Sequence, residues 1–355
     1  MVANLAAALG GVDTSAGSVG LLGLEHEYRL SADGKPVDFR DLLHTVAVPG
    51  RRLDPGDTNA YRCTSGLALT ADDEDAEVAS PPLPVTAKFT ESMYDWAAAG
   101  RSLLNDVLPA SVAFNGYSTH LSASVPDGDL DDVVDLFAAT FAPALMLVID
   151  RMSSHGVFVR PRPSRLELCG EYVTGERLRA GAALFAGGAR ACALAVGGRA
   201  TAGLPPPLAV HPLVALGRCG LELDRKVTFG FDLYTEGRAA RLPLRDGGAI
   251  STQRYLEAAW HSARSALASH ASPGDLDRAE KVVAGSLPLG IEANGDYDVS
   301  AARPLPPSPY GDLLERRERV GFAVEAVVAS WDFTIFSIRG TTRTAYACAP
   351  RSPHS

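Results

Sequence analysis

Hydrophobic and polar positions follow two different periods along the chain, and the pattern predicts both helices and strands. Where apolar residues recur every three or four positions, one face of a helix is indicated. Helices are predicted over Thr86–Leu108, Leu130–Met152, Glu176–Val196, Thr252–His270, Gly274–Gly285 and Tyr310–Ser330. Where polar and apolar residues alternate, a strand with one buried face is indicated. Strands are predicted over Val19–Ser31, Tyr61–Thr70, Asp75–Ser80, Ser111–Val125, Val157–Cys169, Glu222–Tyr234 and Phe333–Ala347.

The order of these elements predicts an α+β fold. Strands come first and regular strand–helix–strand alternation is missing, so a doubly wound parallel sheet is not expected. Alternation within the strands predicts a mostly antiparallel sheet that has one polar face and is flanked by helices. The Pro- and Gly-rich stretches 201–212 and 303–309 are predicted loops, too short to establish a domain boundary. We therefore expect a single domain over residues 1–355.

Composition and charge narrow the class of protein. A chain of 355 residues with 46% hydrophobic and 21% charged residues is typical of a folded globular protein. Its net charge of −9 argues against nucleic acid as the main partner. The apolar stretch Val133–Ile149 is interrupted by Asp135 and Pro143, which favours a buried helix over a membrane span. The N-terminus has no convincing secretory signal. We expect a cytoplasmic protein without a membrane partner, and a homo-oligomer is left open.

Several familiar motifs are missing from the sequence. The five cysteines are widely spaced and form no CxxC pair, which disfavours a zinc site built on thiolates. There is no GxxxxGK[ST], no GxSxG, no HExxH, and no GxGxxG between a strand and a helix. The glycines of residues 187–199 (GGARACALAVGGR) lie in an Ala-rich helical stretch, where helix packing is the simpler explanation.

Instead, four predicted strands each place ligand-type residues on one face, because side chains two positions apart share a side of a strand. Glu25 and Glu27 lie together, with Leu24, His26 and Tyr28 on the opposite face. The other three strands contribute Glu77, the set Ser118, His120, Ser122 and Ser124, and the set Arg165, Glu167 and Cys169. Taken singly, each set is most simply a solvated face or a structural histidine. Together on neighbouring strands the carboxylates would repel one another unless cations held them, and oxygen ligands favour Mg²⁺ or Mn²⁺ over Zn²⁺.

The motifs also occur in a familiar order. GLEHEY, AEVASPPLP, a Ser-Thr-His-Leu-Ser strand and Arg-Leu-Glu-Leu follow one another within residues 20–175. In this the chain resembles the glutamine synthetase-like ligases, most of all the glutamate–cysteine ligase and carboxylate–amine ligase branch and related amidoligases. The resemblance implies a curved antiparallel sheet that binds ATP with two or three divalent ions, Mg²⁺ or Mn²⁺. It also implies that residues 1–18 are an N-terminal extension, 20–175 a ligase core, and 176–355 helices and closing strands of one catalytic domain.

Carried over by position, the resemblance implies metal-binding roles for Glu25, Glu27, Glu77, Glu167 and His120, with His120 and Ser122 near the nucleotide. Two residues depart from the pattern of the family. Ser118 stands where a first histidine is usual, and Cys169 stands where the Arg of Glu-x-Arg is expected. The second departure leaves the transferred phosphate without its usual neutralising group unless Arg160, Arg162 or Arg165 supplies it, and these three are the candidate catalytic residues.

Further candidates are less sharply defined. Arg339 and Arg343 could bind a substrate carboxylate or could be exposed surface residues. Cys169 could be a substrate contact or a small packing residue. The polar loops Asp54–Asn59 and Arg241–Gly248 could close over an acyl phosphate or could be surface turns.

Three hypotheses about function follow. The first is an ATP-dependent carboxylate–amine ligase that forms an amide through an acyl phosphate from a small-molecule carboxylate, such as glutamate, and an amine. The second is an amide hydrolase on the same scaffold. The third is a non-catalytic binding protein that retains the fold.

Overall fold

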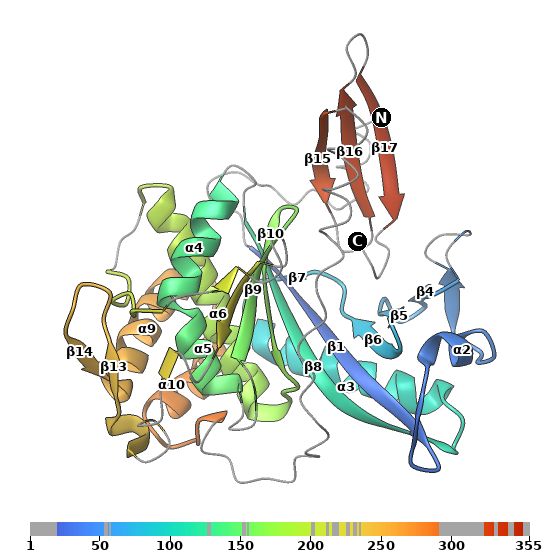
Figure 1. Ribbon diagram of the computed structural model, residues 1–355, viewed down its shortest axis with the longest axis horizontal. Helices are drawn as coiled ribbons and strands as arrows, with labels where there is room; N and C mark the ends of the chain where they lie inside the picture. The colour runs from blue at the N-terminus through green and yellow to red at the C-terminus, as the bar shows by residue number, and fades with distance from the viewer. Residues whose placement is uncertain are drawn as a thin grey trace.

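The computed structural model is shown in Figure 1. It describes residues 20–290 apart from short gaps, and the backbone of three strands beyond them. The gaps are at 53–55, 57, 126–128, 151–153, 155, 200–202, 211–212, 215–219, 225–227, 230–232 and 234–235.

A twelve-stranded sheet forms the centre of the fold, and all its pairings are antiparallel. Ten strands follow one another across the sheet, in the order β11 (Leu213–Val214), β12 (Leu221–Asp224), β9 (Gly156–Arg162), β10 (Arg165–Glu171), β8 (Val112–Ser124), β1 (Leu21–Ala32), β6 (Asp75–Ala79), β5 (Ala68–Asp72), β4 (Ala60–Cys63) and β3 (Gly50–Arg52). Two short strands, β2 (Lys35–Val37) and β7 (Leu83–Pro84), also pair with β1. The expected α+β fold with a large antiparallel sheet is therefore confirmed.

Alternation along each strand separates an apolar face from a polar face. In β1, Leu22 and Leu24 join the main hydrophobic core, whereas Glu25 and Glu27 lie on the opposite face of the strand. The neighbouring strands repeat the pattern, so their leucines and valines pack under the helices while their ionisable residues share the other face. This division of the strands gathers the candidate site residues on one surface of the sheet.

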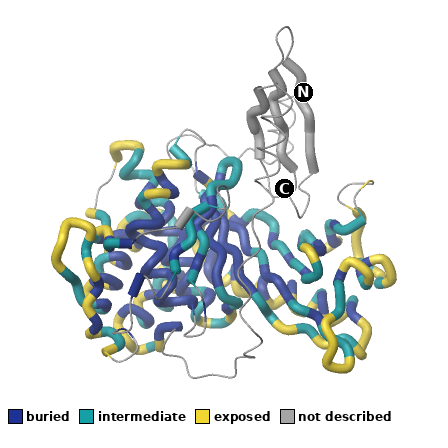
Figure 2. Tube along the Cα trace, in the orientation of Figure 1, coloured by how far each residue is buried: buried dark blue, intermediate teal, exposed yellow. Residues whose placement is uncertain are grey.

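Helices cover the apolar face, and Figure 2 shows the buried residues concentrated where helices and sheet meet. The described helices are α2 (Phe39–Leu43), α3 (Phe89–Val107), α4 (Leu130–Thr140), α5 (Ala142–Ile149), α6 (Gly175–Val196), η3 (Gly237–Ala239), α9 (Thr252–Leu267) and α10 (Pro273–Val283). One core joins β1, β8, β9 and β10 to most of these helices, and a smaller one lies around Tyr28 and β5.

The glycines of α6 serve helix packing, as the sequence indicated. A Cβ added at Gly187 would lie 2.6 Å from the carbonyl oxygen of Ala263 in α9, and one at Gly188 would lie 2.7 Å from the ring of Phe141. Side chains at these positions would push the helices apart, because real Cβ contacts are longer than 3 Å.

A carboxylate from α10 caps the start of α3. Lys88 precedes α3 with a left-handed backbone (φ 71°) and offers no side-chain cap of its own. Asp275 instead accepts hydrogen bonds from the backbone N–H groups of Lys88 (2.7 Å) and Thr90 (3.0 Å), and from the Thr90 hydroxyl (3.0 Å). These bonds satisfy donors that the first turn of a helix leaves free, and they link two helices far apart in sequence.

Several predicted elements differ from the observed ones. The helix predicted over Leu130–Met152 is two helices, α4 and α5, bent by 55° and separated at Phe141, because Pro143 starts a new helix. The strand predicted over Glu222–Tyr234 ends at Asp224, and Thr228, Phe229 and Leu233 have helical backbone. Within Arg241–Gly248, predicted as a loop, residues 241–243 form β13 (Arg241–Pro243), which pairs with β14 (Ala249–Ser251).

The C-terminal prediction was partly wrong. Within the helix predicted over Tyr310–Ser330, the structure has β15 (Ala323–Ala329), a valine-rich segment that pairs with β16 (Phe333–Arg339). With β17 (Thr344–Pro350) these strands form a separate antiparallel sheet. Residues 310–322 lie outside the described part of the chain.

Among the described residues, no single helix is long and apolar enough to cross a membrane. The bent pair α4 and α5 meets the length and composition criteria only when its two helices are taken together.

Candidate functional site

Strand β1 lies at the centre of the candidate site. Glu27 is in register with Glu77 of β6 on one side and with Ser118 of β8 on the other, while Glu25 is in register with His120 of β8. The hydroxyl of Ser118 donates a hydrogen bond to Glu27. The predicted acids of the first two motifs therefore meet through ordinary cross-strand pairing.

Asp72 at the end of β5 joins these acids, although it was missing from the sequence-based candidates. One carboxylate oxygen from each of Glu27, Asp72 and Glu77 lies within 4.8 Å of the others. The Thr70 hydroxyl donates to Glu77 across the same hairpin, at 2.8 Å. The predicted strand ended at Thr70, and continuing its alternation for two more residues would have placed Asp72 on the same face.

Crowding of these acids changes their protonation. Burial, together with the charges of Glu25, Asp72 and Glu27, raises the pKa of Glu77 well above its ordinary value. Burial and the neighbouring Glu27 likewise raise the pKa of Asp72 to about 7. A bound divalent cation would offset the repulsion among these carboxylates and favour their ionised forms.

His120 lies between the acids of β1 and the strand β10. Its Nδ1 is 3.4 Å from Glu25 Oε2, and its Nε2 is 3.5 Å from Glu27 Oε1 and 3.3 Å from the Ser118 hydroxyl. Burial alone would lower the pKa of His120, but the adjacent Cys169, Glu27 and Glu25 raise it well above its usual value. One ligand atom each of Glu25, Glu77 and His120 also lies within 4.8 Å of the others, so this nitrogen could share a cation with two carboxylates.

The other end of the site is basic. Arg162 Nε of β9 donates to both carboxylate oxygens of Glu167, at 2.8 and 3.1 Å, and Arg160 Nη1 lies 4.0 Å from the same carboxylate. Arg165 is also buried on this strand pair, with 4% of its surface exposed. Although burial works in the opposite direction, the three guanidinium groups hold the pKa of Glu167 far below its usual range. Glu167 thus differs from the other predicted acids, because guanidinium groups lie beside it.

The remaining candidates have different positions. Cys169 is fully buried beside His120, and Ser122 is buried in register with Glu167. The Ser124 hydroxyl, at the end of β8, accepts a hydrogen bond from the backbone N–H of Leu21 at 2.9 Å. Arg339 lies in β16, of which only the backbone is described, and Arg343 is outside the described residues, as is Asp54 in one of the predicted closing loops.

His26 lies on the opposite, helix-covered side of the sheet, as the alternation predicted. Its ring packs 4.7 Å from that of Tyr172, and burial lowers its pKa to about 3. A neutral histidine enclosed by aromatic rings is a core residue, so only alternate residues of GLEHEY belong to the site.

The polar face therefore has two electrostatic halves. Carboxylates from β1, β5 and β6 form one half, guanidinium groups from β9 and β10 form the other, and His120 of β8 lies between them. Such an arrangement can hold divalent cations at one end and phosphate oxygens at the other, which is the combination that phosphoryl transfer requires.

Comparison with known proteins adds only a distant likeness. No protein-family profile and no curated protein matches the chain. Among solved structures, the complex of the prokaryotic ubiquitin-like protein Pup with its ligase PafA is similar with a TM-score of 0.43 and 11% identity, over 95% of this chain and 90% of that one. The Pup ligase PafA in complex with ADP gives 0.37 and 11%, over 85% and 88%. At these values the likeness assigns neither family nor activity, so the function must be argued from the site itself.

Proposed function

We propose that this protein is an ATP-dependent carboxylate–amine ligase that activates a carboxylate as an acyl phosphate and forms an amide from it. The observation that carries the proposal is the division of one sheet face into an acidic half around Glu27 and a basic half around Arg162. Metal-dependent binding alone would need the acids, but it would give no reason to place the buried Arg160 and Arg165 and the largely enclosed Arg162 opposite them.

The acidic half fits divalent cations. Its two oxygen-rich groups, Glu27 with Asp72 and Glu77, and Glu25 with Glu77 and His120, offer the hard ligands that Mg²⁺ and Mn²⁺ favour. The raised pKa values of Asp72 and Glu77 support this assignment, because the acids are mutually destabilising without added positive charge. When bound there, the ions would neutralise the β- and γ-phosphate oxygens of ATP.

The basic half would orient and neutralise the transferred phosphoryl group. Guanidinium groups present several donors in a rigid plane that matches phosphate oxygens. Glu167 holds Arg162 in place through both of its oxygens, which fixes the direction of the side chain. Arg160 and Arg165 lie around the same carboxylate. They could neutralise the transferred phosphate, which in the glutamine synthetase-like ligases is the role of an arginine at the position of Cys169.

The chemistry follows from these two halves. A carboxylate oxygen of the substrate attacks the γ-phosphorus, the bond from the β,γ-bridging oxygen to that phosphorus breaks, and ADP leaves. The amine then attacks the acyl carbon, phosphate leaves, and the amine proton must be taken up by a base. Glutamate is the first carboxylate to test, because the family resemblance favours an amino acid.

An assay with Mg²⁺, ATP, a panel of carboxylates and a panel of amines tests the proposal. We expect ADP release that depends on both partners, and a product whose mass equals their sum less one water. Glu27→Gln should abolish the activity, whereas Glu91→Gln, the same change on an exposed turn of α3, should not. Amide cleavage without net ATP turnover would instead identify a hydrolase, and nucleotide binding without turnover would identify a binding protein. Either result would overturn the ligase proposal.

A further inference from the structure

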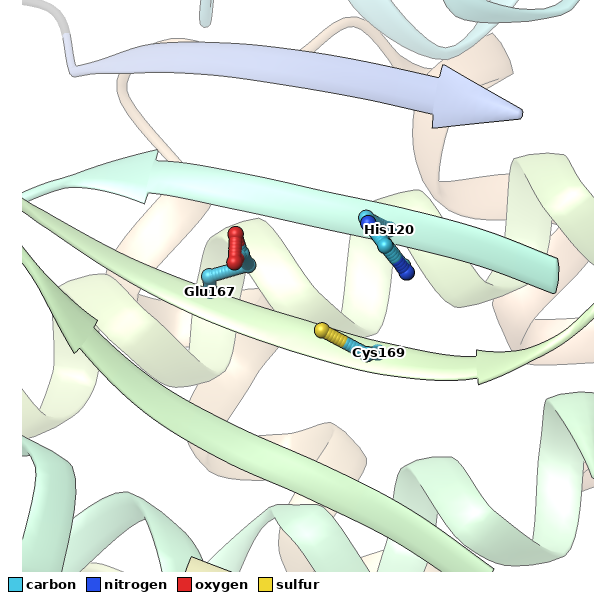
Figure 3. Close-up of side chains that lie close together, drawn as sticks. All are labelled: His120, Glu167 and Cys169. Carbon is cyan, nitrogen blue, oxygen red and sulfur yellow. The ribbon is translucent and has the colours of Figure 1, made fainter. Parts of the chain in front are cut away.

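A group of nitrogen, oxygen and sulfur side chains lies between β8 and β10 (Figure 3). His120 is in register with Cys169, and Ser122 is in register with Glu167, so the four residues form a square of cross-strand neighbours on the polar face. One ligand atom each from His120, Glu167 and Cys169 lies within 4.8 Å of the others, and all three residues are buried. This square differs chemically from the acidic half because it contains a thiol.

A second observation indicates that something binds there. The Ser122 hydroxyl is buried, with 2% of the residue exposed, and has no hydrogen-bond partner among the residues that the structure describes. Its neighbours in the register place it on the same face as His120 and Glu167. A buried hydroxyl normally has a partner, so a bound group or its coordinated water is expected beside it.

We propose that His120, Glu167 and Cys169 form a site for a borderline divalent cation of the Zn²⁺ type. Imidazole, carboxylate and thiolate are the three common protein ligands of zinc, and three of them leave one position for water or a ligand oxygen. Mg²⁺ has little affinity for sulfur, so the thiol selects against it. The site goes beyond the proposed ligase activity, which gives Cys169 no role, although the site shares His120 with the acidic half and Glu167 with the basic half.

The spacing of the square suits such an ion. Zinc bonds are about 2.0–2.3 Å long, so the ligands of a tetrahedral site lie roughly 3.3–3.8 Å apart. Small rotations of side chains already within 4.8 Å would bring the ligand atoms to that spacing. Cys169 can therefore contribute a ligand although it belongs to no CxxC motif, because the pairing of β8 with β10 brings His120 beside it.

The ion pair with Arg162 is compatible with this role. Arg162 donates through Nε to both Glu167 oxygens, but an ionised carboxylate has about four acceptor positions. Positions remain for a cation, while Arg162 orients the carboxylate from behind as outer partners of metal ligands do.

Titration of the full chain with Co²⁺ alone tests the site, because cobalt bound to a thiolate gives a sulfur-to-metal charge-transfer band in the near ultraviolet. We expect one such band in the unsubstituted protein, displaced by an equivalent of Zn²⁺ and unaffected by a large excess of Mg²⁺. Cys169→Ser should abolish the band and weaken Zn²⁺ binding by about 100-fold or more. Cys192→Ser is the matched control, since Cys192 is a buried cysteine of α6 that lies beside Thr140.

Two further results make the test decisive. Cys169→Ala, with circular dichroism and thermal unfolding as folding checks, separates loss of the ligand from loss of the fold. Absence of the band in the unsubstituted protein, or its persistence in folded Cys169→Ser and Cys169→Ala, would overturn the proposal. Mg²⁺-dependent ADP release measured on the same samples keeps the two proposals apart, because a missing band with intact turnover contradicts only the zinc-type site.

Discussion

Glu27 of β1 lies in register with Glu77 of β6, and the two carboxylates share the polar face of the sheet with Asp72. Neighbouring acids on adjacent strands normally repel one another, and the raised pKa values of Asp72 and Glu77 reflect that cost. We therefore expect the free energy of unfolding to be lower without cations than with them. The first predictions follow from this relationship.

Removing one acid should stabilise the cation-free protein. In the presence of a chelator at pH 8, Asp72→Asn should raise the free energy of unfolding by about 1 kcal/mol, because it relieves repulsion in a partly screened site. Added Mg²⁺ should stabilise the unsubstituted protein more than the variant. Denaturant unfolding measures both effects, and Asp95→Asn on the exposed face of α3 is the control. If Asp72→Asn destabilises the protein under chelation, mutual repulsion of the acids is not the dominant effect.

The same relationship predicts a pH dependence with a definite sign. The folded state raises the pKa of Asp72 from 3.8 to about 7, so between these values the folded chain binds more protons than the unfolded chain. The contribution of Asp72 to the free energy of unfolding therefore falls as the pH rises through this window.

The difference in the free energy of unfolding between Asp72→Asn and the unsubstituted protein isolates the contribution of Asp72. Other groups also titrate, such as His26, whose lowered pKa makes the free energy of unfolding rise with pH. Under chelation the stability advantage of Asp72→Asn should be near zero at pH 4 and should grow up to pH 8. Saturating Mg²⁺ should remove the trend. A difference that does not vary with pH would contradict the proposed electrostatics.

The ion pair of Arg162 and Glu167 should show strong coupling. Arg162→Met leaves a buried carboxylate without its closest partner, at a cost of about 3–5 kcal/mol in the free energy of unfolding. Glu167→Gln in the same chain should recover much of that loss, because the uncompensated charge is then removed. A double-mutant cycle from denaturant unfolding measures the coupling, and additive effects of the two substitutions would show that the pair contributes little.

Asp275 should be a major determinant of stability remote from the site. Asp275→Ala removes the acceptor for Lys88, Thr90 and Ser272, and we expect a loss of about 2–4 kcal/mol in the free energy of unfolding. Asp277→Ala is the control, since the partly exposed Asp277 of the same helix pairs with Arg278 and Lys281 and caps none of the described helices. Hydrogen exchange should show faster opening of the first turn of α3 in Asp275→Ala, and unchanged exchange there would mean that the cap is not formed in solution.

Much of the site could be predicted from the sequence because alternation in a strand is local. Glu25 and Glu27 could be assigned to one face, and His26 to the other, without knowing any partner strand. Asp72 was missed because its position depends on where the β5–β6 hairpin turns, which the apolar pattern left undefined.

The pairing of Glu167 was also missed, because the prediction of one strand over Val157–Cys169 was wrong and the structure has two paired strands there, β9 and β10. The β9–β10 hairpin turns at Pro163-Ser164, and a two-residue turn there places Arg160 opposite Glu167. The break between α4 and α5 had a local signal in Pro143, which the helix predicted over Leu130–Met152 did not use. The strand β15 required tertiary context, since apolar periodicity alone favoured a helix there.

The central claim is that a carboxylate oxygen attacks the γ-phosphate of ATP on this sheet face. A substrate carboxylate labelled with ¹⁸O tests this most directly, with the released phosphate analysed by mass spectrometry. Acyl phosphate formation predicts one ¹⁸O atom transferred to phosphate for each ADP released, and no transfer by Glu27→Gln. Release of ADP with unlabelled phosphate, or no ADP release with any carboxylate and amine pair, would contradict the account.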